Sequence, residues 1–425
     1  MINNIFKNTD IGKIPIEWDI KRMSDIFYVQ HGVSLTPTRR EKQSNYPMLR
    51  TLNVLWGRIT TEKLDSSWFS EHEIKTLTPK LGDLFVCEGG DIGRTAMWED
   101  DIGEIGYQNH LHRLRKKHDN IHPLFYAYWM QFAILLRKLY IDQANKTTIP
   151  NLSQSRLMRL NVACPPFEEQ KRIAYILSKL QNAIKIQEKQ IEILNQLKGV
   201  LMHRLFTEGI GHTEFKDTEL GLVPKAWRLV KLSEATQGYK TVNSSNFKTG
   251  KFRYIDVSSI SREYLSIDSY KELDVSEAPS RARKIVREGD VIFATVRPSL
   301  RRVAMIPKEL DGEICSTAFC VLRSNQELVL PDYLFSYVSN DYFVRAVSAK
   351  EKGATYPAIT DSDILERRIP LPEFSEQRDI ANFHRTILSR LLIERERAFN
   401  LRGLFNTMLS KLMSGQIRTK DLVMH

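Results

Sequence analysis

The 425-residue sequence is poor in cysteine and has no long apolar run. Its four cysteines, Cys87, Cys164, Cys315 and Cys320, form no Cys-x-x-Cys pair, which argues against a disulfide framework and favours a reducing compartment. The most apolar stretch, residues 124–136, is too short to span a bilayer and contains a glutamine. The N-terminus has no basic start followed by an apolar run, so we expect no signal peptide. These absences predict a cytoplasmic protein without membrane contact.

Several catalytic motifs are also missing. No Gly-x-x-x-x-Gly-Lys-Ser/Thr occurs, which excludes a P-loop motor, and no Gly-x-Gly loop follows a predicted strand to bind S-adenosylmethionine. Pro331-Asp332 is not followed by Glu-x-Lys at nuclease spacing. The "PPF" of residues 165–167 looks like part of the Asn/Asp-Pro-Pro-aromatic loop of amino-methyltransferases, but Cys164 stands where the acceptor for the target base should be. We therefore expect no catalytic residue in this chain.

The composition is that of a globular protein with an excess of positive charge. Hydrophobic residues make up 42% and charged residues 27%, and the length allows two or three domains. Lys and Arg number 62 against 51 Asp and Glu, a net charge of +11. Such an excess suits a polyanionic partner such as nucleic acid.

The chain contains an internal repeat. "CPPFEEQKRI" from Cys164 matches "LPEFSEQRDI" from Leu371 at an offset of 207 residues. "DIGKIPIEWDIKRMSDI" from Asp10 matches "ELGLVPKAWRLVKLSEA" from Glu219 at an offset of 209. "LGDLFV" from Leu81 echoes "EGDVIF", and these blocks occur in the same order in both halves. We therefore predict an internal two-fold repeat.

The repeat also tests a possible metal site. "HLHRLRKKHDNIH" places four histidines close together, but the aligned "AFCVLRSNQELVL" keeps only Cys320 as a possible ligand. We therefore interpret the four as strand and loop residues and expect no metal: His110, His112, His118 and His122.

Each half has short β-rich runs and apolar helices followed by one long helix, which predicts an α+β fold. Both long helices carry apolar residues at alternating steps of four and three, a heptad seam. Each seam could pack on its own globular domain; antiparallel pairing of the two helices as a coiled coil is favoured, because seams of equal length occur twice. Polar residues at one equivalent position, Gln187 and Glu394, could set the register. The predicted seam residues are Ile173, Leu177, Leu180, Ile184, Gln187, Ile191, Leu194, Leu201, Leu205, Ile387, Leu391, Glu394, Leu401, Met408 and Leu412.

Taken together, these features resemble the specificity subunit of type I restriction–modification systems. The resemblance rests on the doubled "P-P-x-x-E-Q-x-x-I"-like junction, the opening "G-x-x-P-x-x-W" and the Gly-Asp strand, and it covers nearly the whole chain. It implies target-recognition domains at residues 1–165 and 209–372, each followed by a spacer helix, at residues 166–208 and 373–416.

The resemblance implies a non-catalytic role in a larger complex. Each recognition domain would read one half of a bipartite, asymmetric site in double-stranded DNA. The helices would space the domains and dock two modification (methyltransferase) subunits, which two restriction (motor-nuclease) subunits join. S-adenosylmethionine and ATP with Mg²⁺ would bind these partners, and this chain would need no cofactor.

Residues that read DNA should differ between the halves, because the half-sites differ. Divergent polar and basic segments precede "NYPMLR" and "FRYIDV" and follow each Gly-Asp strand. Arginine can contact guanine, asparagine adenine, and lysine mostly phosphate. The candidates are Arg39, Arg40, Lys42, Arg94, Lys240, Asn243, Asn246, Lys251, Arg297, Arg301 and Arg302.

Two other functions account for less of the sequence. A fused restriction–modification polypeptide would need the catalytic motifs that are missing. A coiled-coil adaptor that binds only protein would account for the helices, but not for doubled domains with basic, divergent loops.

Overall fold

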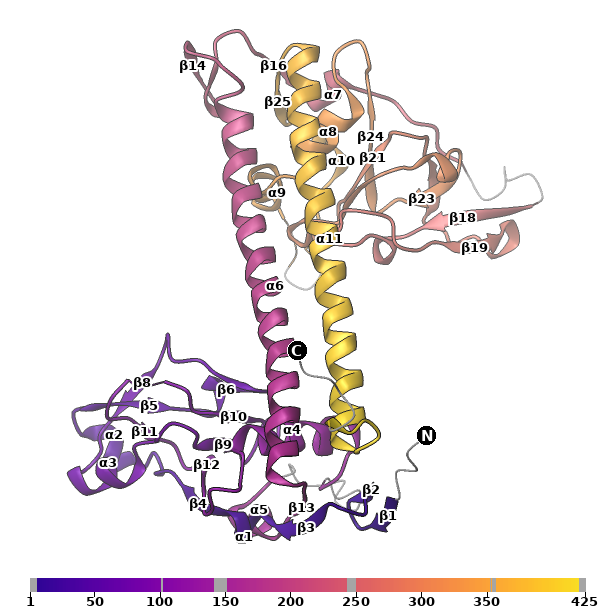
Figure 1. Ribbon diagram of the computed structural model, residues 1–425. Helices are drawn as coiled ribbons and strands as arrows, with labels where there is room; N and C mark the ends of the chain where they lie inside the picture. The colour runs from indigo at the N-terminus through magenta and orange to yellow at the C-terminus, as the bar shows by residue number, and fades with distance from the viewer. Residues whose placement is uncertain are drawn as a thin grey trace. The chain divides into compact units, whose positions relative to one another are not determined.

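The computed structural model describes residues 6–100, 102–140, 151–242, 250–351, 353 and 357–419 (Figure 1). The chain forms two compact units: unit 1 comprises Met1–Gln187 and Ala398–His425, and unit 2 comprises Glu188–Arg397. Each unit has a globular part with strands and helices and a segment of both long helices, so the fold is mixed α and β. Because the units divide both long helices, the predicted division into four domains stays a prediction.

Unit 1 is built on a four-stranded sheet of order β10-β9-β12-β4, next to a three-stranded sheet of order β11-β5-β8. In the three-stranded sheet β5 pairs parallel with β11 and antiparallel with β8. The strands are β1 (Phe6–Thr9), β2 (Gly12–Pro15), β3 (Asp19–Arg22), β4 (Phe27–His31), β5 (Tyr46–Leu49), β6 (Val54–Leu55), β7 (Arg58–Ile59), β8 (Asp65–Ser67), β9 (Leu84–Cys87), β10 (Thr95–Met97), β11 (Gly106–Tyr107), β12 (Leu111–Lys116) and β13 (Asn161–Cys164). The helices are α1 (Met23–Ile26), α2 (Pro37–Glu41), the 3₁₀ turn η1 (Thr51–Asn53), α3 (Glu71–Leu77), α4 (Pro123–Gln131), the π-helical turn η2 (Phe132–Leu136), α5 (Gln154–Arg159) and the start of α6 (Phe167–Thr207).

Unit 2 has a four-stranded sheet of order β17-β24-β21-β22 and a second of order β19-β18-β23-β20. In the second sheet β18 pairs parallel with β23 and antiparallel with β19. The strands are β14 (Phe215–Thr218), β15 (Gly221–Pro224), β16 (Arg228–Lys231), β17 (Thr236–Gln237), β18 (Lys251–Ile255), β19 (Lys271–Asp274), β20 (Ala282–Ile285), β21 (Val291–Ala294), β22 (Val303–Met305), β23 (Ile314–Ser316), β24 (Phe319–Ser324) and β25 (Arg368–Leu371). The helices are α7 (Leu232–Ala235), η4 (Val257–Ser259), η5 (Val275–Glu277), η6 (Pro298–Leu300), η7 (Lys308–Leu310), α8 (Pro331–Val338), α9 (Asp341–Ser348), α10 (Asp361–Leu365) and most of α11 (Phe374–Met413).

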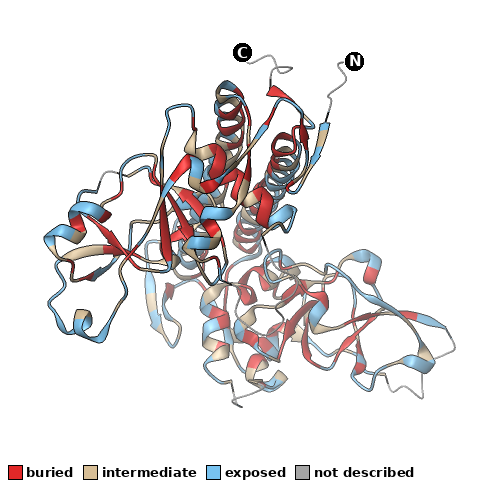
Figure 2. Ribbon diagram, turned by 90° about the horizontal axis from the view of Figure 1, so that it is seen from below, coloured by how far each residue is buried: buried red, intermediate tan, exposed pale blue. Residues whose placement is uncertain are grey.

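The central strand of unit 1, β9, is apolar at every position because both of its faces are covered. Leu84 and Val86 lie in one hydrophobic core, while Phe85 and Cys87 lie in another on the opposite face. Figure 2 shows buried segments running through the sheets of both globular parts. A continuous apolar strand is therefore what a two-sided core requires.

The Gly-Asp motif before each central strand forms a buried fork with an arginine. Asp83 accepts from Arg115 Nε at 2.9 Å and NH2 at 2.5 Å. Asp290 accepts from Arg323 in the same way, at 2.9 and 2.7 Å. Both aspartates are 2% exposed, and a buried carboxylate needs a hydrogen-bonded partner such as an arginine. The motif is therefore structural.

The other repeated motifs lock the start of each long helix to its globular part. In unit 1, Trp18 Nε1 donates to Glu169 at 2.9 Å, and Arg418, beyond the end of α11, donates to the same carboxylate at 2.7 Å. In unit 2, Trp227 Nε1 donates to Glu376 at 2.9 Å, and His212 contacts that carboxylate at 3.0 Å. The Trp and Glu of the two motifs thus form one contact in each unit.

The predicted seam residues lie on the covered side of both long helices. Every predicted seam residue is buried or half-buried. In unit 1, Leu177 of α6 and Leu412 of α11 lie in one core with the globular part; in unit 2, Leu205 of α6 and Ile380 of α11 do so. Within each unit the seam residues therefore pack against both the globular part and the other helix. Glu394 is 1% exposed and pairs with Arg390 at 2.5 Å and Arg397 at 3.2 Å on its own helix.

Within the described ranges, none of the helices combines the length and the apolar composition needed to cross a membrane.

Candidate nucleic-acid interface

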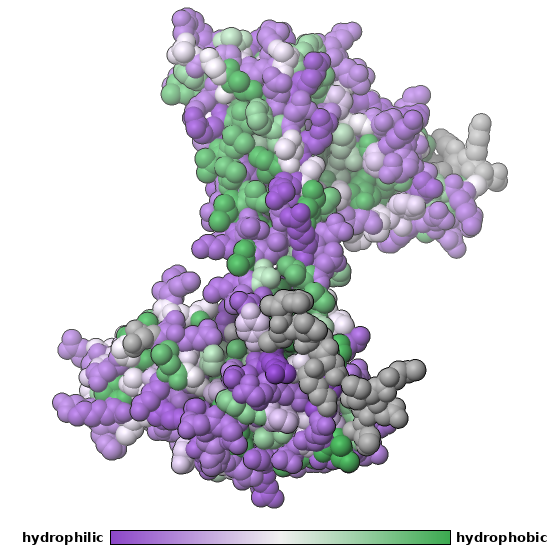
Figure 3. Space-filling model, viewed as in Figure 1, coloured by the Kyte–Doolittle hydropathy of each residue, from purple (hydrophilic) through white to green (hydrophobic). Residues whose placement is uncertain are grey.

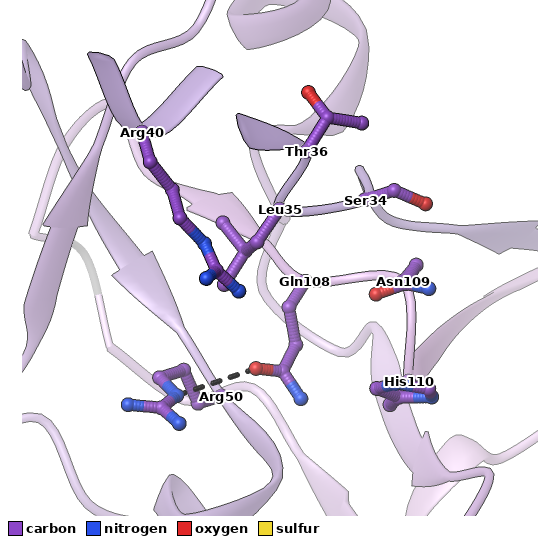
Figure 4. A pocket seen from close by; sticks show the side chains of 8 residues that line it. All are labelled: Ser34, Leu35, Thr36, Arg40, Arg50, Gln108, Asn109 and His110. Atoms are coloured by element: carbon purple, nitrogen blue, oxygen red, sulfur yellow. Dashed lines mark hydrogen bonds between the residues drawn. The ribbon is translucent and has the colours of Figure 1, made fainter. Parts of the chain in front are cut away.

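Unit 1 has a recess of about 400 Å³ at the edge of its three-stranded sheet. Figure 4 shows the side chains of Arg40, Arg50 and Gln108 converging on it. The lining residues are Ser34, Leu35, Thr36, Arg40, Arg50, Gln108, Asn109 and His110.

Strand pairing places two of these side chains together. Arg50 follows β5 and Gln108 follows β11, and these strands are parallel neighbours with Leu49 opposite Tyr107. The backbone N–H of Gln108 donates to the Leu49 carbonyl at 3.0 Å. Arg50 Nε donates to Gln108 Oε1 at 3.3 Å, and Arg50 NH1 to Asp65 at 2.5 Å. Because parallel strands end at the same sheet edge, residues far apart in the sequence meet there.

The chemistry of the recess suits the edges of bases and phosphate. It gathers two guanidinium groups, two carboxamides, an imidazole and two hydroxyls. None of its lining residues, all within the described part of the chain, carries a carboxylate. Guanidinium groups pair with guanine and carboxamides with adenine in the major groove.

The other predicted DNA contacts of unit 1 already have protein partners. Arg39 pairs with Glu73 at 2.6 Å, and Lys42 lies 3.6 Å from the ring centre of Trp68. Burial alone would raise the pKa of the Glu73 carboxyl, but hydrogen bonds from Arg39 and the Ser70 amide bring it below its ordinary value. Arg39 and Lys42 thus flank one tryptophan, and Arg40 between them in sequence lines the recess.

In unit 2, Lys240, Lys251 and Arg297 are exposed. Arg301 forms an ion pair with Asp341 of α9. Asn243 and Asn246 lie outside the described residues. That these residues contact DNA stays a prediction.

Arg94 and Arg302 have the same structural role in the two units. Arg94 NH2 donates to the Thr51 carbonyl at 3.0 Å, where η1 begins. Arg302 NH1 donates to the Val257 carbonyl, where η4 begins. Each arginine thus supports a 3₁₀ turn after a sheet strand. That they also contact DNA stays a prediction.

Sequence reasoning did not select several polar residues at these edges. Arg50, Gln108 and Asn109 were not among the candidates, because they lie in and beside motifs that look like scaffold. The exposed residues Arg281, directly before β20, and Arg283, within it, were also missed, although the basic run "SRARK" marks them in the sequence.

Cys87 and Cys315 are buried thiols, and two of the clustered histidines contact other protein groups. Burial raises the pKa of the Cys87 thiol to about 11 and that of Cys315 to about 12, so neither is a thiolate at neutral pH. His112 is buried with Nε2 3.1 Å from the Leu152 carbonyl. His110 is exposed, with Nδ1 3.5 Å from Glu88.

Comparison with known proteins identifies relatives over the whole chain. The family model for the type I restriction modification DNA specificity domain matches twice, at residues 15–196 and 224–398. The type I restriction enzyme MjaVIII specificity subunit of Methanocaldococcus jannaschii is 25% identical, covering 98% of this chain and 97% of its own.

Two solved structures resemble the fold. The S subunit of a type I restriction–modification system from M. genitalium matches with a TM-score of 0.56 at 15% identity over 97% of both chains. A chain from a study of complex assembly and conformational transition of the type I R-M system matches with a TM-score of 0.54 at 16% identity, over 95% of this chain and 99% of that one. At these identities the likeness concerns the fold alone.

Proposed function

Because this chain belongs to the family of type I restriction–modification DNA specificity subunits, we propose that it reads a bipartite, asymmetric site in double-stranded DNA. Each globular part would read one half-site. The observation that carries this proposal is the recess of unit 1, where Arg40, Arg50 and Gln108 converge without a lining carboxylate. The net charge of +11 supports it, because attraction to phosphate supplies much of the affinity for DNA.

The chain is a non-catalytic subunit, as the specificity subunits that it resembles are, and the complex is the enzyme. Such subunits assemble with methyltransferase and restriction subunits and bind DNA. For this chain we propose two modification and two restriction subunits, with S-adenosylmethionine and ATP with Mg²⁺ on those partners. We expect the complex to act in the cytoplasm.

We further propose that the chain is an internal two-fold repeat with an antiparallel pair of spacer helices. The matched Trp–Glu contacts and Asp–Arg forks of the two units support this. So do the two matches of the family model.

The outer sides of the long helices are proposed docking surfaces for the modification subunits. On α6, Ile193, Leu197 and Val200 are 51–62% exposed at helical spacing. Figure 3 shows apolar side chains gathered over this half of α6. A row of exposed apolar side chains on a helix favours contact with a partner protein.

The test is to map methylated adenines in cells with and without this chain. We expect methylation at one bipartite site only when the chain is present. To exclude the adaptor, binding of the chain itself to DNA is measured against salt: direct phosphate contacts give an affinity that falls steeply as salt rises, whereas an adaptor without DNA contacts would not bind.

A further inference from the structure

In one sheet of each unit, β11-β5-β8 of unit 1 and β19-β18-β23-β20 of unit 2, the strands β5 and β18 are paired in the same way, which identifies equivalent residues in the two units. In unit 1, Met48 of β5 lies opposite Asp65 of β8 and Gly106 of β11. In unit 2, Tyr254 of β18 lies opposite Lys271 of β19 and Ile314 of β23. Met48 therefore corresponds to Tyr254. Arg50 lies two residues after Met48 and Asp256 two residues after Tyr254, so Arg50 of unit 1 corresponds to Asp256 of unit 2.

The backbone at this position is the same in both units. The Arg50 amide donates to Asn53 Oδ1 at 2.9 Å, and the Asp256 amide donates to Ser259 Oγ at 3.2 Å. A 3₁₀ turn follows in each case, and its first carbonyl accepts a hydrogen bond from Arg94 or Arg302. The two side chains are thus presented from one common scaffold.

The side chains themselves form the same ion pair with its charges reversed. Arg50 NH1 lies 2.5 Å from Asp65 Oδ2, whereas Lys271 Nζ lies 2.6 Å from Asp256 Oδ2. Cation and anion have therefore exchanged strands between the units.

Stability does not account for the reversal. Arg50, Asp65 and Lys271 are 42%, 53% and 59% exposed and Asp256 is 20% exposed, and ion pairs with at least one well-exposed partner add little to stability in either polarity. Arg50 lines the recess beside Gln108, so its polarity decides what the recess can bind.

We propose that this reversed pair is a specificity determinant of the two half-sites, an inference that rests on the proposed function. In unit 1, Arg50 exchanges Asp65 for the O6 and N7 acceptors of a guanine. In unit 2, Asp256 exchanges Lys271 for the N4 amino group of a cytosine. Asp65 and Lys271 are positioning residues that hold the reader in the absence of DNA.

The atoms available fit these roles. A guanidinium group can donate twice to guanine, and a carboxylate accepts from cytosine. Asp256 Oδ1 is held by the Ser258 amide at 2.8 Å, so Oδ2, which binds Lys271, is the atom that can turn to a base. Burial alone would raise the pKa of Asp256, but the hydrogen bond from Lys271 lowers it below its ordinary value. The carboxylate therefore stays an acceptor at neutral pH.

The experiment uses the intact complex with its modification subunits on a DNA library in which both half-sites are randomised, and sequences the methylated products. The wild type should prefer guanine at one position of the first half-site, by roughly 5- to 150-fold, the discrimination of one bidentate pair. Arg50→Gln should replace that guanine by adenine, because a carboxamide pairs with adenine. The exchange Arg50→Asp with Asp65→Lys should replace it by cytosine, and the second half-site should not change.

The matched control exchanges another exposed ion pair of unit 1, Lys116→Asp with Asp119→Lys, and should leave the motif unchanged. The mirror exchange Asp256→Arg with Lys271→Asp should alter the second half-site alone. If Arg50→Gln methylates the unchanged motif, the inference is wrong while the proposed function stands; this single variant decides the matter even where the exchange fails to assemble. If the wild-type complex methylates without sequence preference, the proposed function is wrong as well.

Discussion

At the scale of single residues, the buried carboxylates of Asp83 and Asp290 are each paired with an arginine, and comparison of the two units shows which pairs belong to the scaffold. The forks of Asp83 with Arg115 and of Asp290 with Arg323 have the same atoms and nearly the same distances. The pair of Arg50 with Asp65 differs from its counterpart in polarity. Equivalence in chemistry thus indicates scaffold, and the reversed pair is the one that we propose for readout.

The first prediction tests the scaffold. Asp83→Asn removes the charge that Arg115 faces and should lower the free energy of unfolding of unit 1 by about 2–3 kcal/mol. The loss is smaller than for a fully buried pair because Arg115 is 29% exposed. Denaturant unfolding followed by tryptophan fluorescence measures it. The control, Asp119→Asn on the surface, should change stability by less than about 0.5 kcal/mol; equal effects of the two variants would refute a structural role for the fork.

The second prediction concerns pH. Burial and the charge of Lys198 lower the pKa of His384 to about 3. The unfolded chain takes up this proton as the pH falls below about 6.5, while the folded chain does not, so stability is present above that pH and is lost toward pH 3. Lowering the pH from 7 to 5 should therefore reduce the free energy of unfolding of unit 2 by about 2 kcal/mol through this one group.

His384→Leu, which introduces the residue found at the equivalent position 177, should remove that pH dependence from unit 2. Buried His112 and half-buried His122 of unit 1 also have lowered pKa values, through burial, and remain in both proteins. The measured quantity is therefore the difference between wild type and variant in unfolding free energy at pH 7 and pH 5. Parallel curves would contradict the prediction.

At the scale of elements, the long helices have an inner and an outer face with different tasks. α6 begins after Pro165-Pro166 with Glu168 and Glu169 in its first turn, where acidic side chains favour a helix N-terminus. Its seam is covered, while its outer apolar residues are exposed. The apolar stretch before it, at residues 124–136, becomes the buried α4 followed by the π-helical turn η2.

The third prediction separates the two faces with neighbouring residues. Leu194→Asp places a charge on the covered seam and should destabilise unit 2 by more than about 2 kcal/mol. Leu401→Asp should do the same in unit 1. Ile193→Asp, on the face where the side chain is 52% exposed, should leave stability within about 0.5 kcal/mol and weaken assembly with the modification subunit.

Thermal unfolding and co-purification with the modification subunit measure these two effects. If Ile193→Asp assembles as the wild type does, α6 does not dock its partner through this face. If Leu194→Asp leaves stability and assembly unchanged, the seam does not form a helix–helix core.

At the scale of the whole molecule, the repeat predicts the behaviour of half a chain. A fragment of residues 1–210 would expose its apolar seam residues, each worth roughly 1.5–3 kcal/mol when fully buried. A second copy offers the same helix, so we expect a closed two-fold dimer. With two identical readers it should direct methylation to a palindrome of the first half-site. Sedimentation and methylation mapping check this, and a monomer at micromolar concentration, or methylation of the original site, would contradict it.

The equivalent fragment from the second half is the control. It places two copies of Glu394 near the dyad, and although Arg390 and Arg397 partly balance each carboxylate, it should dimerise less well than the first fragment, where Gln187 is neutral. Equal dimerisation would show that these positions do not approach the dyad.

The sequence by itself determined the matching blocks of the two halves, the two long helices and the covered side of each, because these depend on local periodicity and on the order of residues along the chain. It also indicated the family, since the junction motifs occur twice in one order. It did not indicate what those motifs bind. That Glu169 holds Trp18 and Arg418 follows from contacts between segments far apart in the sequence.

Only the tertiary structure decided which polar residues share an edge. Arg50, Asp65 and Gln108 meet because β5 pairs with β8 on one side and with β11 on the other, and no local pattern encodes that choice of neighbours. In the same way, Arg94 and Arg302 look in the sequence like basic loop residues. Their guanidinium groups nevertheless turn inward, because partly buried backbone carbonyls at η1 and η4 accept hydrogen bonds from them.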